Sequence, residues 1–227
     1  MCGRYVSPEQ AAIERFWHVG RHNNSNPFQR RFNVAPTTVV PIILRGDGLQ
    51  EGLPLELIGA RWGLIPHWWK KDTLPTLTFN ARSEEAAQKP MWRDALRTHR
   101  CLMPACGWYE WCESEPVHTA AGRKVNQPYY IRSPRSDVMA IAGLWSSAGP
   151  VVSCALMTRA AAPCIAAIHH RMPVILKPEH YESWLSPETL DLKAIIDDAQ
   201  QDFEGYRVST QVNNTRNDFP ELLNATS

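Results

Sequence analysis

The sequence predicts an α+β protein, a single compact domain built on a curved, barrel-like and mostly antiparallel sheet that is flanked by helices. Three observations support this fold class. Strand-like apolar runs dominate the middle of the chain, and helical patterns are short and scattered. A chain of 227 residues can bury a substantial core. No repeat or low-complexity linker divides it, so we expect one domain over 1–227, with an acidic helical part from about residue 178.

The N-terminal third is expected to alternate strands with one helix. Residues 2–6 (CGRYV) have the composition of a short strand. A helix is predicted over 7–17, with Ser7 as its N-cap and Gln10 closing a capping box. After a polar loop, apolar segments bounded by turn residues, among them a GDG turn, predict strands over 38–44 and within 55–66.

The middle of the chain is expected to be mostly strands. A long loop from residue 67 should enter a helix near Ser83, and another helix is predicted over 90–99. Residues 112–126 resemble a hairpin-like insertion between strands. The apolar runs that predict strands cover 101–111, 127–132, 138–145 and 151–158.

The C-terminal third is expected to contain most of the remaining helices. A short helix is predicted at 161–169, ahead of a strand at 172–176. Ser186 is expected to cap the second of two later helices, because Pro187 follows it. These two helices cover 177–185 and 186–200, and a last strand is expected at 206–210.

Charge is divided unevenly along the chain. Residues 1–177 carry 21 Lys and Arg against 13 Asp and Glu, whereas residues 178–227 carry 3 against 10. Arginines outnumber lysines by 18 to 6, and arginine suits bidentate phosphate contacts. Nine tryptophans can fill a core or stack on bases. A basic body favours a polyanionic partner, and the alternative is an ordinary solvated surface.

Several classes of protein are disfavoured. The six cysteines form no C-x-x-C motif and no spaced histidine pair follows them, so a zinc site is not expected. Apolar runs are too short for a transmembrane helix, and the N-terminus lacks the pattern of a signal peptide. We therefore expect a cytoplasmic protein, or a nuclear one in a eukaryote, with no membrane partner.

Cys2 has an unusual position. Removal of Met1 would leave Cys2 with a free α-amine beside its thiol. The reference pKa of an α-amine is about 7.7–8.0, against about 10.4 for lysine, so this amine is the best suited to attack an aldehyde. The thiol can then close a thiazolidine ring on the imine. The alternatives are a thiol nucleophile that uses its own amine as base, and a small strand residue that is simply buried.

Two further motifs carry polar groups suited to an active site. Asn80 and Arg82, in TFNARSE, point to one face if the chain is extended, and together can hold an oxygen-rich ligand. The alternative is the cap region of a helix. Glu110, in GWYEW, shares a strand face with Trp108, and a carboxyl group crowded by aromatic rings should have a raised pKa that suits acid–base catalysis. The alternative is an exposed carboxylate on the solvent face.

The IHHRMP segment offers His169 and His170 ahead of Arg171. Histidine titrates near neutral pH and can shuttle protons. Adjacent side chains point in different directions, so at most one of the two histidines is expected to serve a site. A metal site built from this pair is not expected.

Aromatic and cationic residues are interleaved in RWGLIPHWWKK and KPMWRDALR, which is typical of a groove for single-stranded nucleic acid. Trp62 is expected in the core, whereas Trp68 and Trp69 follow a proline, precede two lysines and are candidates for base stacking. Met91 and Trp92 are candidates for an apolar wedge between bases. Packing in the core of a helix is the equal alternative for these last two.

Six motifs occur in a fixed order: MCGRY, FNVAP, RWGLIPHWW, FNARSE, RCLMPACGWYEW and IHHRMPVIL. Together they resemble the SRAP (SOS response-associated peptidase) family of abasic-site processing proteins, from Cys2 to about Leu176. The resemblance implies a barrel-like α+β fold without metal or cofactor. It implies binding to single-stranded DNA and strand junctions, and covalent capture of abasic sites as a thiazolidine. Proteolysis is then limited to exposing the cysteine, and we expect a monomer.

The resemblance also implies roles for individual residues. Cys2 is then the nucleophile, Asn80 positions the opened sugar, Glu110 helps to open the ring by proton transfer, and His169 shuttles protons. The DNA contacts that it implies are phosphate contacts from Arg4, Arg82 and Arg171, and groove contacts from Trp68, Trp69 and Pro36. One departure is a longer polar stretch before Asn80 than compact members of the family have.

Two other functions stay open at this point. An N-terminal-nucleophile cysteine amidohydrolase, such as a glutamine amidotransferase, also begins Met-Cys-Gly. The interleaving of tryptophan with arginine and the aromatic neighbours of Glu110 argue against it. A non-covalent nucleic-acid binder, in which Cys2 is only structural, would keep its full activity without the thiol.

Overall fold

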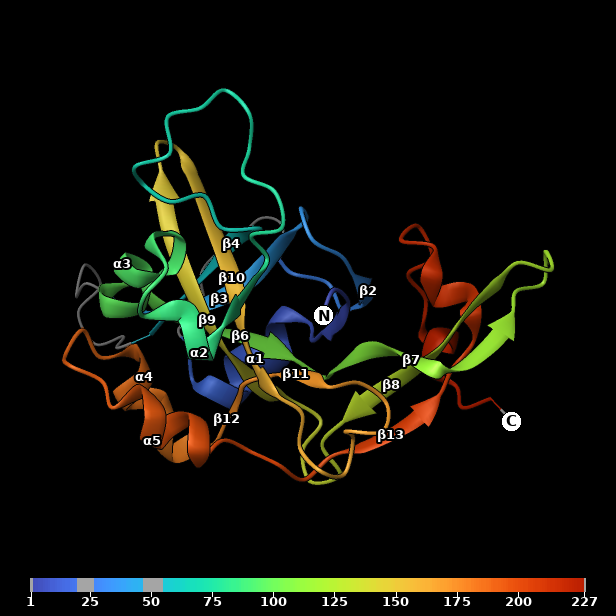
Figure 1. Cartoon of the computed structure of the whole chain (residues 1–227). Coiled ribbons are helices and arrows are strands. Elements are labelled where there is room, and N and C mark those ends of the chain that lie inside the picture. Colours follow the sequence, from blue (N-terminus) through green and yellow to red (C-terminus); the bar gives the residue numbers. More distant parts are fainter. Residues whose placement is uncertain (1, 20–26, 47–54, 227) are drawn as a thin grey trace.

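Two sheets organise the chain (Figure 1). A computed structural model describes residues 2–19, 27–46 and 55–226. One sheet closes into a barrel because its strand β10 pairs on one side with β9 and on the other with β4, and β3 and β6 complete the circuit. The barrel strands are β3 (Val39–Arg45), β4 (Leu55–Trp62), β6 (Arg100–Ala105), β9 (Met139–Ala148) and β10 (Val151–Ala160).

The β10–β4 pairing is parallel and the other four barrel pairings are antiparallel. The predicted α+β class with a barrel-like, mostly antiparallel sheet is therefore confirmed. Three short strands extend this sheet. Two of them border β10 at Thr158, which lies opposite Arg82 on one side and Pro173 on the other. The three are β5 (Asn80–Arg82), β11 (Arg171–Pro173) and β12 (Ile175–Leu176).

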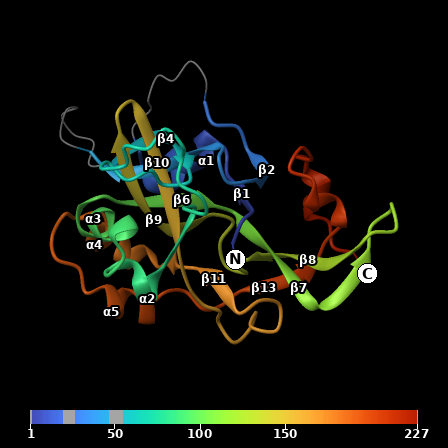
Figure 2. The ribbon, with the colours of Figure 1, turned by 45° about the horizontal axis from the view of Figure 1, so that its top comes forward.

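The second sheet has the strand order β13-β8-β7-β1-β2 and places the N-terminal strand beside the long β7–β8 hairpin (Figure 2). This hairpin corresponds to the insertion expected at 112–126. The strands are β1 (Tyr5–Ser7), β2 (Arg31–Val34), β7 (Gly107–His118), β8 (Lys124–Arg132) and β13 (Glu204–Arg207).

The described helices are short and lie outside the strands (Figure 1). Three of them, α3, α4 and α5, gather on one side of the barrel. The α-helices are α1 (Gln10–Trp17), α2 (Ser83–Ala86), α3 (Pro90–Thr98), α4 (Tyr181–Leu185) and α5 (Leu192–Asp197). Single 3₁₀ turns occur at Pro178–His180, Thr210–Asn213 and Pro220–Leu223.

The predicted capping box before α1 is wrong. Ser7 lies in β1 opposite Arg31, so its backbone continues the strand and the helix begins later, at Gln10. The Gln10 side chain donates instead to Glu14 over 2.7 Å and accepts the Phe28 backbone N–H over 3.1 Å.

Two expectations for the C-terminal helices are also wrong. The helix expected from Ser186 begins only at Leu192, because Asp191 is its cap and accepts the Ala194 N–H over 3.0 Å. Residues 163–168 form turns rather than the short helix expected at 161–169. The GDG turn after β3 lies mostly outside the described residues.

Alternation along the barrel strands divides their apolar side chains into two clusters. Cluster one includes Trp92 and Trp184 from the helices, so it covers the outer face of the barrel. Cluster two takes the opposite set of strand residues, contains no residue of a helix and fills the barrel interior. Trp62 is fully buried in this second cluster, as expected, and Cys2 belongs to it as well. The N-terminal residues are therefore held against the barrel by apolar packing.

Candidate active site around Cys2

The pairing of β1 with β7 brings Cys2 to Glu110. The two strands run antiparallel with Tyr5 opposite Trp108, so the chain preceding Tyr5 passes along the residues that follow Trp108. The thiol of Cys2 and the carboxyl group of Glu110 lie close enough for each to shift the pKa of the other, and both residues are 1% exposed. Burial excludes the alternative in which Glu110 is an exposed surface carboxylate.

Burial shifts both groups towards their protonated forms. It raises the pKa of Glu110 to about 7, in agreement with the raised pKa expected from its aromatic neighbours. Burial and the charge of Glu110 hold the pKa of the Cys2 thiol well above its ordinary value. The Glu110 carboxyl group can therefore give or take a proton at neutral pH, whereas the thiol is not a thiolate.

His169 reaches the same place from the turn between β10 and β11. Its Nδ1 lies 3.7 Å from Oε2 of Glu110 and 3.0 Å from both the backbone N and the backbone O of Arg171. Burial lowers the pKa of His169, so its neutral form prevails at neutral pH. His170 is exposed, and so one histidine of the pair faces the carboxyl group, as expected.

Asn80 is connected to the same region through β5 and three aromatic rings. It opens β5, where it pairs with Leu156 of β10. The indole N–H of Trp62 donates to the Phe79 carbonyl over 2.9 Å, and the Trp62 ring contacts the Tyr5 ring edge-to-face at 5.3 Å. The residue before Asn80 is thereby tied to the strand that follows Cys2.

The Asn80 amide is unusual in its polar environment. Among the described residues, neither its Oδ1 nor its Nδ2 has a hydrogen-bond partner, although both atoms are buried. Leaving a buried polar group unpaired costs about 1–3 kcal/mol, and such groups in folded proteins require an explanation. A ligand with hydroxyl oxygens would satisfy both atoms.

Cys2, Glu110 and His169 belong to a sequence that matches a known protein family over nearly its whole length. Residues 1–215 match the family model described as SOS response associated peptidase (SRAP). The chain belongs to the SRAP family.

Three relatives of this SRAP protein are named abasic site processing proteins. YoqW of Bacillus subtilis (strain 168) is 33% identical over 235 residues, which covers 98% of this chain and 99% of YoqW. YedK of Escherichia coli (strain K12) is 30% identical over 202 residues, covering 85% and 83% of the two chains. HMCES of Gallus gallus is 28% identical over 231 residues, covering 86% and 66%.

The fold also recurs in a solved structure. A protein from Bacteroides thetaiotaomicron superposes with a TM-score of 0.79 over 100% of both chains, at 20% sequence identity. At this identity the likeness concerns the fold alone.

The arginines expected to bind phosphate have different surroundings in the SRAP protein. Arg82 is exposed on β5. Arg171 donates through Nη1 and Nη2 to the carboxylate of Glu84, over 2.6 and 3.0 Å, and through Nη2 to Oγ1 of Thr158 over 3.1 Å. Its side chain is 12% exposed.

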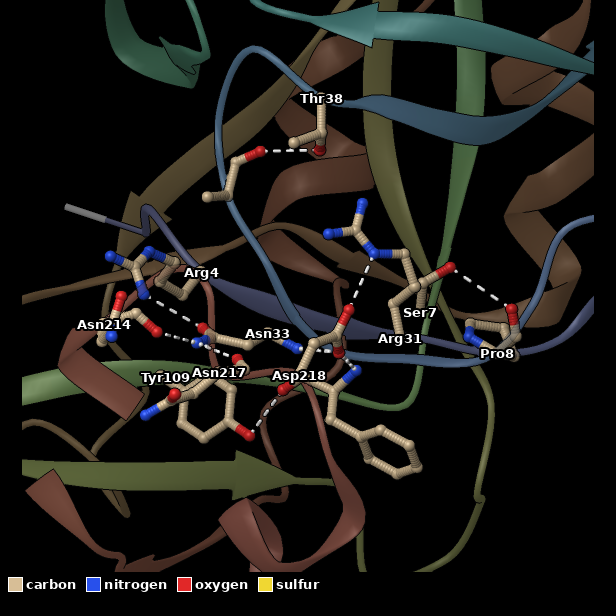
Figure 3. A network of polar contacts seen from close by, with 12 residues as sticks. Arg4, Ser7, Pro8, Arg31, Asn33, Thr38, Tyr109, Asn214, Asn217 and Asp218 are labelled. Atoms are coloured by element: carbon tan, nitrogen blue, oxygen red, sulfur yellow. Dashed lines mark hydrogen bonds and ion pairs between the residues drawn. The ribbon is translucent and has the colours of Figure 1, made fainter. Parts of the chain in front are cut away.

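Arg4 is bound within the protein (Figure 3). Its Nη1 donates to Oδ1 of Asn33 over 3.0 Å and to the Val212 carbonyl over 2.8 Å. Its guanidinium also lies 5.9 Å from the centre of the Trp111 ring. These contacts tie the residues after Cys2 to the C-terminal segment, and the phosphate contact expected of Arg4 stays a prediction.

Asn33 is a supporting residue that our sequence reasoning missed. It is fully buried, and its Nδ2 donates to the carbonyls of Val212, Asn214 and Asn217 over 3.1, 3.1 and 2.8 Å. Asp218 completes the junction by accepting the Asn33 N–H over 3.1 Å (Figure 3). We call this arrangement of Arg4, Asn33 and residues 212–218 the terminal clamp. The FNVAP motif contained the signal, but nothing in it indicates a partner so distant in the sequence.

The loop over 67–79 projects beyond the barrel (Figure 1). Trp68 is 40% exposed, and Leu77 is 73% exposed. The Trp69 indole N–H donates to the Thr73 carbonyl over 2.8 Å, and the Lys71 ammonium lies 5.2 Å from the Trp69 ring centre. Trp68 is therefore the accessible ring of the pair, whereas the Trp69 ring is already covered by Lys71, and the base-stacking role expected of them stays a prediction.

The remaining candidates for DNA contacts are less accessible. Trp92 is 7% exposed and packs in the outer cluster, while Met91 is partly buried against it. Core packing, the alternative left open by the sequence, therefore describes Trp92, and we assign it no DNA contact. Pro36 lies half-buried in the turn between β2 and β3.

The described part of the chain contains no group of three or more His, Cys, Asp or Glu side chains that could hold a metal ion. Over the same residues, no helix has the length and apolar content needed to cross a membrane. All six cysteines are free thiols, and Cys164 is the exposed one.

Proposed function

We propose that this SRAP protein processes abasic sites in single-stranded DNA by forming a thiazolidine crosslink through Cys2 after Met1 has been removed. One observation carries the proposal. The thiol of Cys2, the carboxyl group of Glu110 and the imidazole of His169 meet in a buried site, in a chain whose relatives are named abasic site processing proteins.

The chemistry begins with the opening of the abasic sugar. In its closed form the aldehyde is masked as a hemiacetal, so a proton must reach the ring oxygen while another leaves the hydroxyl on C1′. Glu110, with a pKa of about 7, supplies the first proton, and neutral His169 accepts the second. The 3.7 Å between Nδ1 of His169 and Oε2 of Glu110 places the two groups close enough to act on the same sugar. The unpaired amide of Asn80 holds the hydroxyl groups of the opened sugar.

The crosslink then forms in two steps at Cys2. The α-amine adds to the aldehyde carbon, and loss of water gives an imine. The thiol sulfur adds to the imine carbon while its proton passes to the imine nitrogen, which closes the five-membered ring. Both groups belong to one residue, so the second step is intramolecular and needs no thiolate formed in advance.

DNA binding is the third part of the proposal. The strand would reach Cys2 past the loop that carries Trp68, with bases stacked on its ring and phosphates on Arg82 and the nearby lysines. We propose that a monomer binds single strands and strand junctions in this way, in the cytoplasm or the nucleus. Either autoproteolysis or a methionine aminopeptidase would expose Cys2.

The test is a denaturing gel with a single-stranded oligonucleotide that contains one abasic site. Protein with a mature N-terminus is expected to give a slowly migrating band that survives heating in detergent. Cys2→Ala should abolish the band, and Cys164→Ala, at an exposed thiol far along the chain, should keep it. A band of equal intensity with Cys2→Ala, or no band with the wild type, would refute the crosslink.

The glutamine amidotransferase alternative makes a different prediction. Such an enzyme attacks an amide with a thiolate, whereas burial keeps the Cys2 thiol protonated. We expect no release of ammonia from glutamine by the mature protein. Ammonia release that depends on Cys2 would favour the alternative.

A further inference from the structure

Glu84 forms an ion pair with Arg171 across strand β10. It lies in the first turn of α2, which directly follows β5 and Asn80. Its two carboxylate oxygens accept one hydrogen bond each from Nη1 and Nη2 of Arg171, which lies on β11. Between β5 and β11 runs β10, whose Thr158 accepts a third bond from the same guanidinium.

The backbone of Arg171 holds the imidazole of His169. The Arg171 N–H lies 3.0 Å from Nδ1 of His169, and the Arg171 carbonyl oxygen lies at the same distance from that nitrogen. A histidine ring is oriented, and its tautomer is selected, by the partner of the nitrogen that does not react. The position of Arg171 therefore sets the orientation of His169 beside Glu110.

The Arg171 guanidinium has little freedom of its own. Its side chain is 12% exposed, and its Nε is buried with no acceptor among the described residues. Both terminal nitrogens are occupied by the bidentate pair with Glu84, a geometry that fixes direction as well as distance. Without this carboxylate the guanidinium keeps only Thr158 as an acceptor, so its direction is no longer fixed and the end of β11 that carries it is held less firmly.

We propose that Glu84 is a positioning residue for the abasic-site reaction, which holds Arg171 and, through its backbone, the imidazole of His169 in line with Glu110 and Asn80. The inference rests on the proposed function and deepens it. Glu84 occupies the nitrogens of Arg171 that a phosphate would bind. In the protein without DNA, Arg171 therefore acts as a positioning group and not as a phosphate contact. Because the Glu84 side chain is 51% exposed, the pair contributes little to global stability, and its loss leaves the fold intact.

The test compares Glu84→Gln with a matched control on the same helix. Glu85→Gln removes a carboxylate that pairs with Lys89 in the next turn and does not touch Arg171. At saturating DNA, Glu84→Gln is expected to form the crosslink on the order of ten- to a hundredfold more slowly, because a misplaced catalytic group costs about this much. Glu85→Gln should react at the wild-type rate, and both variants should melt at the wild-type temperature.

The second readout is the NMR titration of the His169 ring, which requires no DNA. The charged groups that act on this ring besides Arg171 are Glu110, the N-terminal amine, His170 and Glu113. In Glu84→Gln the guanidinium loses its counter-charge, so the His169 midpoint should move to lower pH, whereas Glu85→Gln should leave it unchanged. Arg171→Lys, which keeps the charge but cannot pair in bidentate form, should slow the reaction to the same extent as Glu84→Gln. The double variant should be no slower than either single one.

Two results would overturn the inference. The first is a wild-type rate together with an unmoved His169 midpoint in Glu84→Gln. The second is an unchanged rate at saturation combined with tighter binding of intact single strands, which would make Glu84 a competitor of phosphate rather than a positioning group. The His169 titration is measured without DNA, so it judges the positioning role even if the wild type forms no crosslink.

Discussion

At the scale of single residues, the two acid–base groups of the site have pKa values shifted in opposite directions by the same burial. Glu110 is raised to about 7, and His169 is lowered from its ordinary value. At pH 7 about half of Glu110 is therefore protonated and most of His169 is neutral, so the proposed proton donor and acceptor are present together. Such opposed shifts are the usual way in which one site holds an acid and a base together.

This pairing predicts how the rate of crosslink formation depends on pH. The rate should rise as the α-amine of Cys2 loses its proton, near its reference pKa of about 7.7–8.0, and fall as Glu110 loses its own, near pH 7. The optimum should lie between about 7 and 8. Glu110→Gln is expected to lower the rate by about 10²–10⁴ and to remove the alkaline fall, as measured by quenched gel time courses. A profile that keeps its alkaline limb in this variant would assign that limb to another group.

The raised pKa of Glu110 also predicts that replacing this residue stabilises the protein. The pKa of Glu110 is higher in the folded protein than its ordinary value of 4.5. The contribution of Glu110 to the free energy of unfolding is therefore most favourable below pH 4.5 and is lost as the pH rises through about 7. At pH 8, Glu110→Gln should raise the free energy of unfolding by about 3 kcal/mol, and at pH 4 by much less. Urea titrations at the two pH values measure the difference. Equal effects at both would show that the carboxyl group is not the cause.

At the scale of elements, the terminal clamp fastens β1 and β2 to the 3₁₀ turn after β13. Asn33 donates to three carbonyls of this segment, of which only that of Val212 also accepts from Arg4. Asn33→Ala should leave buried carbonyls without donors and cost about 3 kcal/mol in the free energy of unfolding. Asn224→Ala, at an exposed asparagine that lies beyond the clamp near the end of the described chain, should cost less than about 0.5 kcal/mol. If the two variants unfold at the same denaturant concentration, the clamp contributes no stability.

The loop over 67–79 predicts a contact with bases. Trp68→Ala should weaken binding to an intact single strand by about 1–3 kcal/mol, because a stacked base is lost. Phe16→Ala, at an aromatic residue of similar exposure on α1, is the control and should bind like the wild type. Fluorescence anisotropy with a labelled oligonucleotide measures both. Equal affinity for Trp68→Ala and the wild type would place the strand elsewhere.

At the scale of the whole molecule, the uneven charge predicts a strong dependence of DNA binding on salt. Single-strand binding should weaken with a slope of about −0.7 in log K against log salt for every phosphate that is neutralised. Arg82→Gln should reduce the slope by about that amount, since Arg82 is exposed beside the site. A slope unaffected by this change would show that Arg82 does not contact a phosphate.

The sequence predicts much of this molecule where neighbours along the chain decide the structure. Alternation places Trp108 and Glu110 on one strand face, and most strands occur where their apolar runs predict them. The capping box fails because a tertiary contact overrides a local pattern, since Ser7 is held in a ladder with Arg31. The same limit explains why Asn33 and Glu84 escape notice. Their partners lie far along the chain, and only the pairing of distant strands brings them together.

The terminal clamp also has a consequence for biosynthesis. A ribosome makes Arg4 and Asn33 well before their partners in residues 212–218. Until residue 218 has been added, a nascent chain has no clamp to fasten the residues that follow Cys2. The N-terminal strands are therefore fastened to the rest of the fold only late in synthesis.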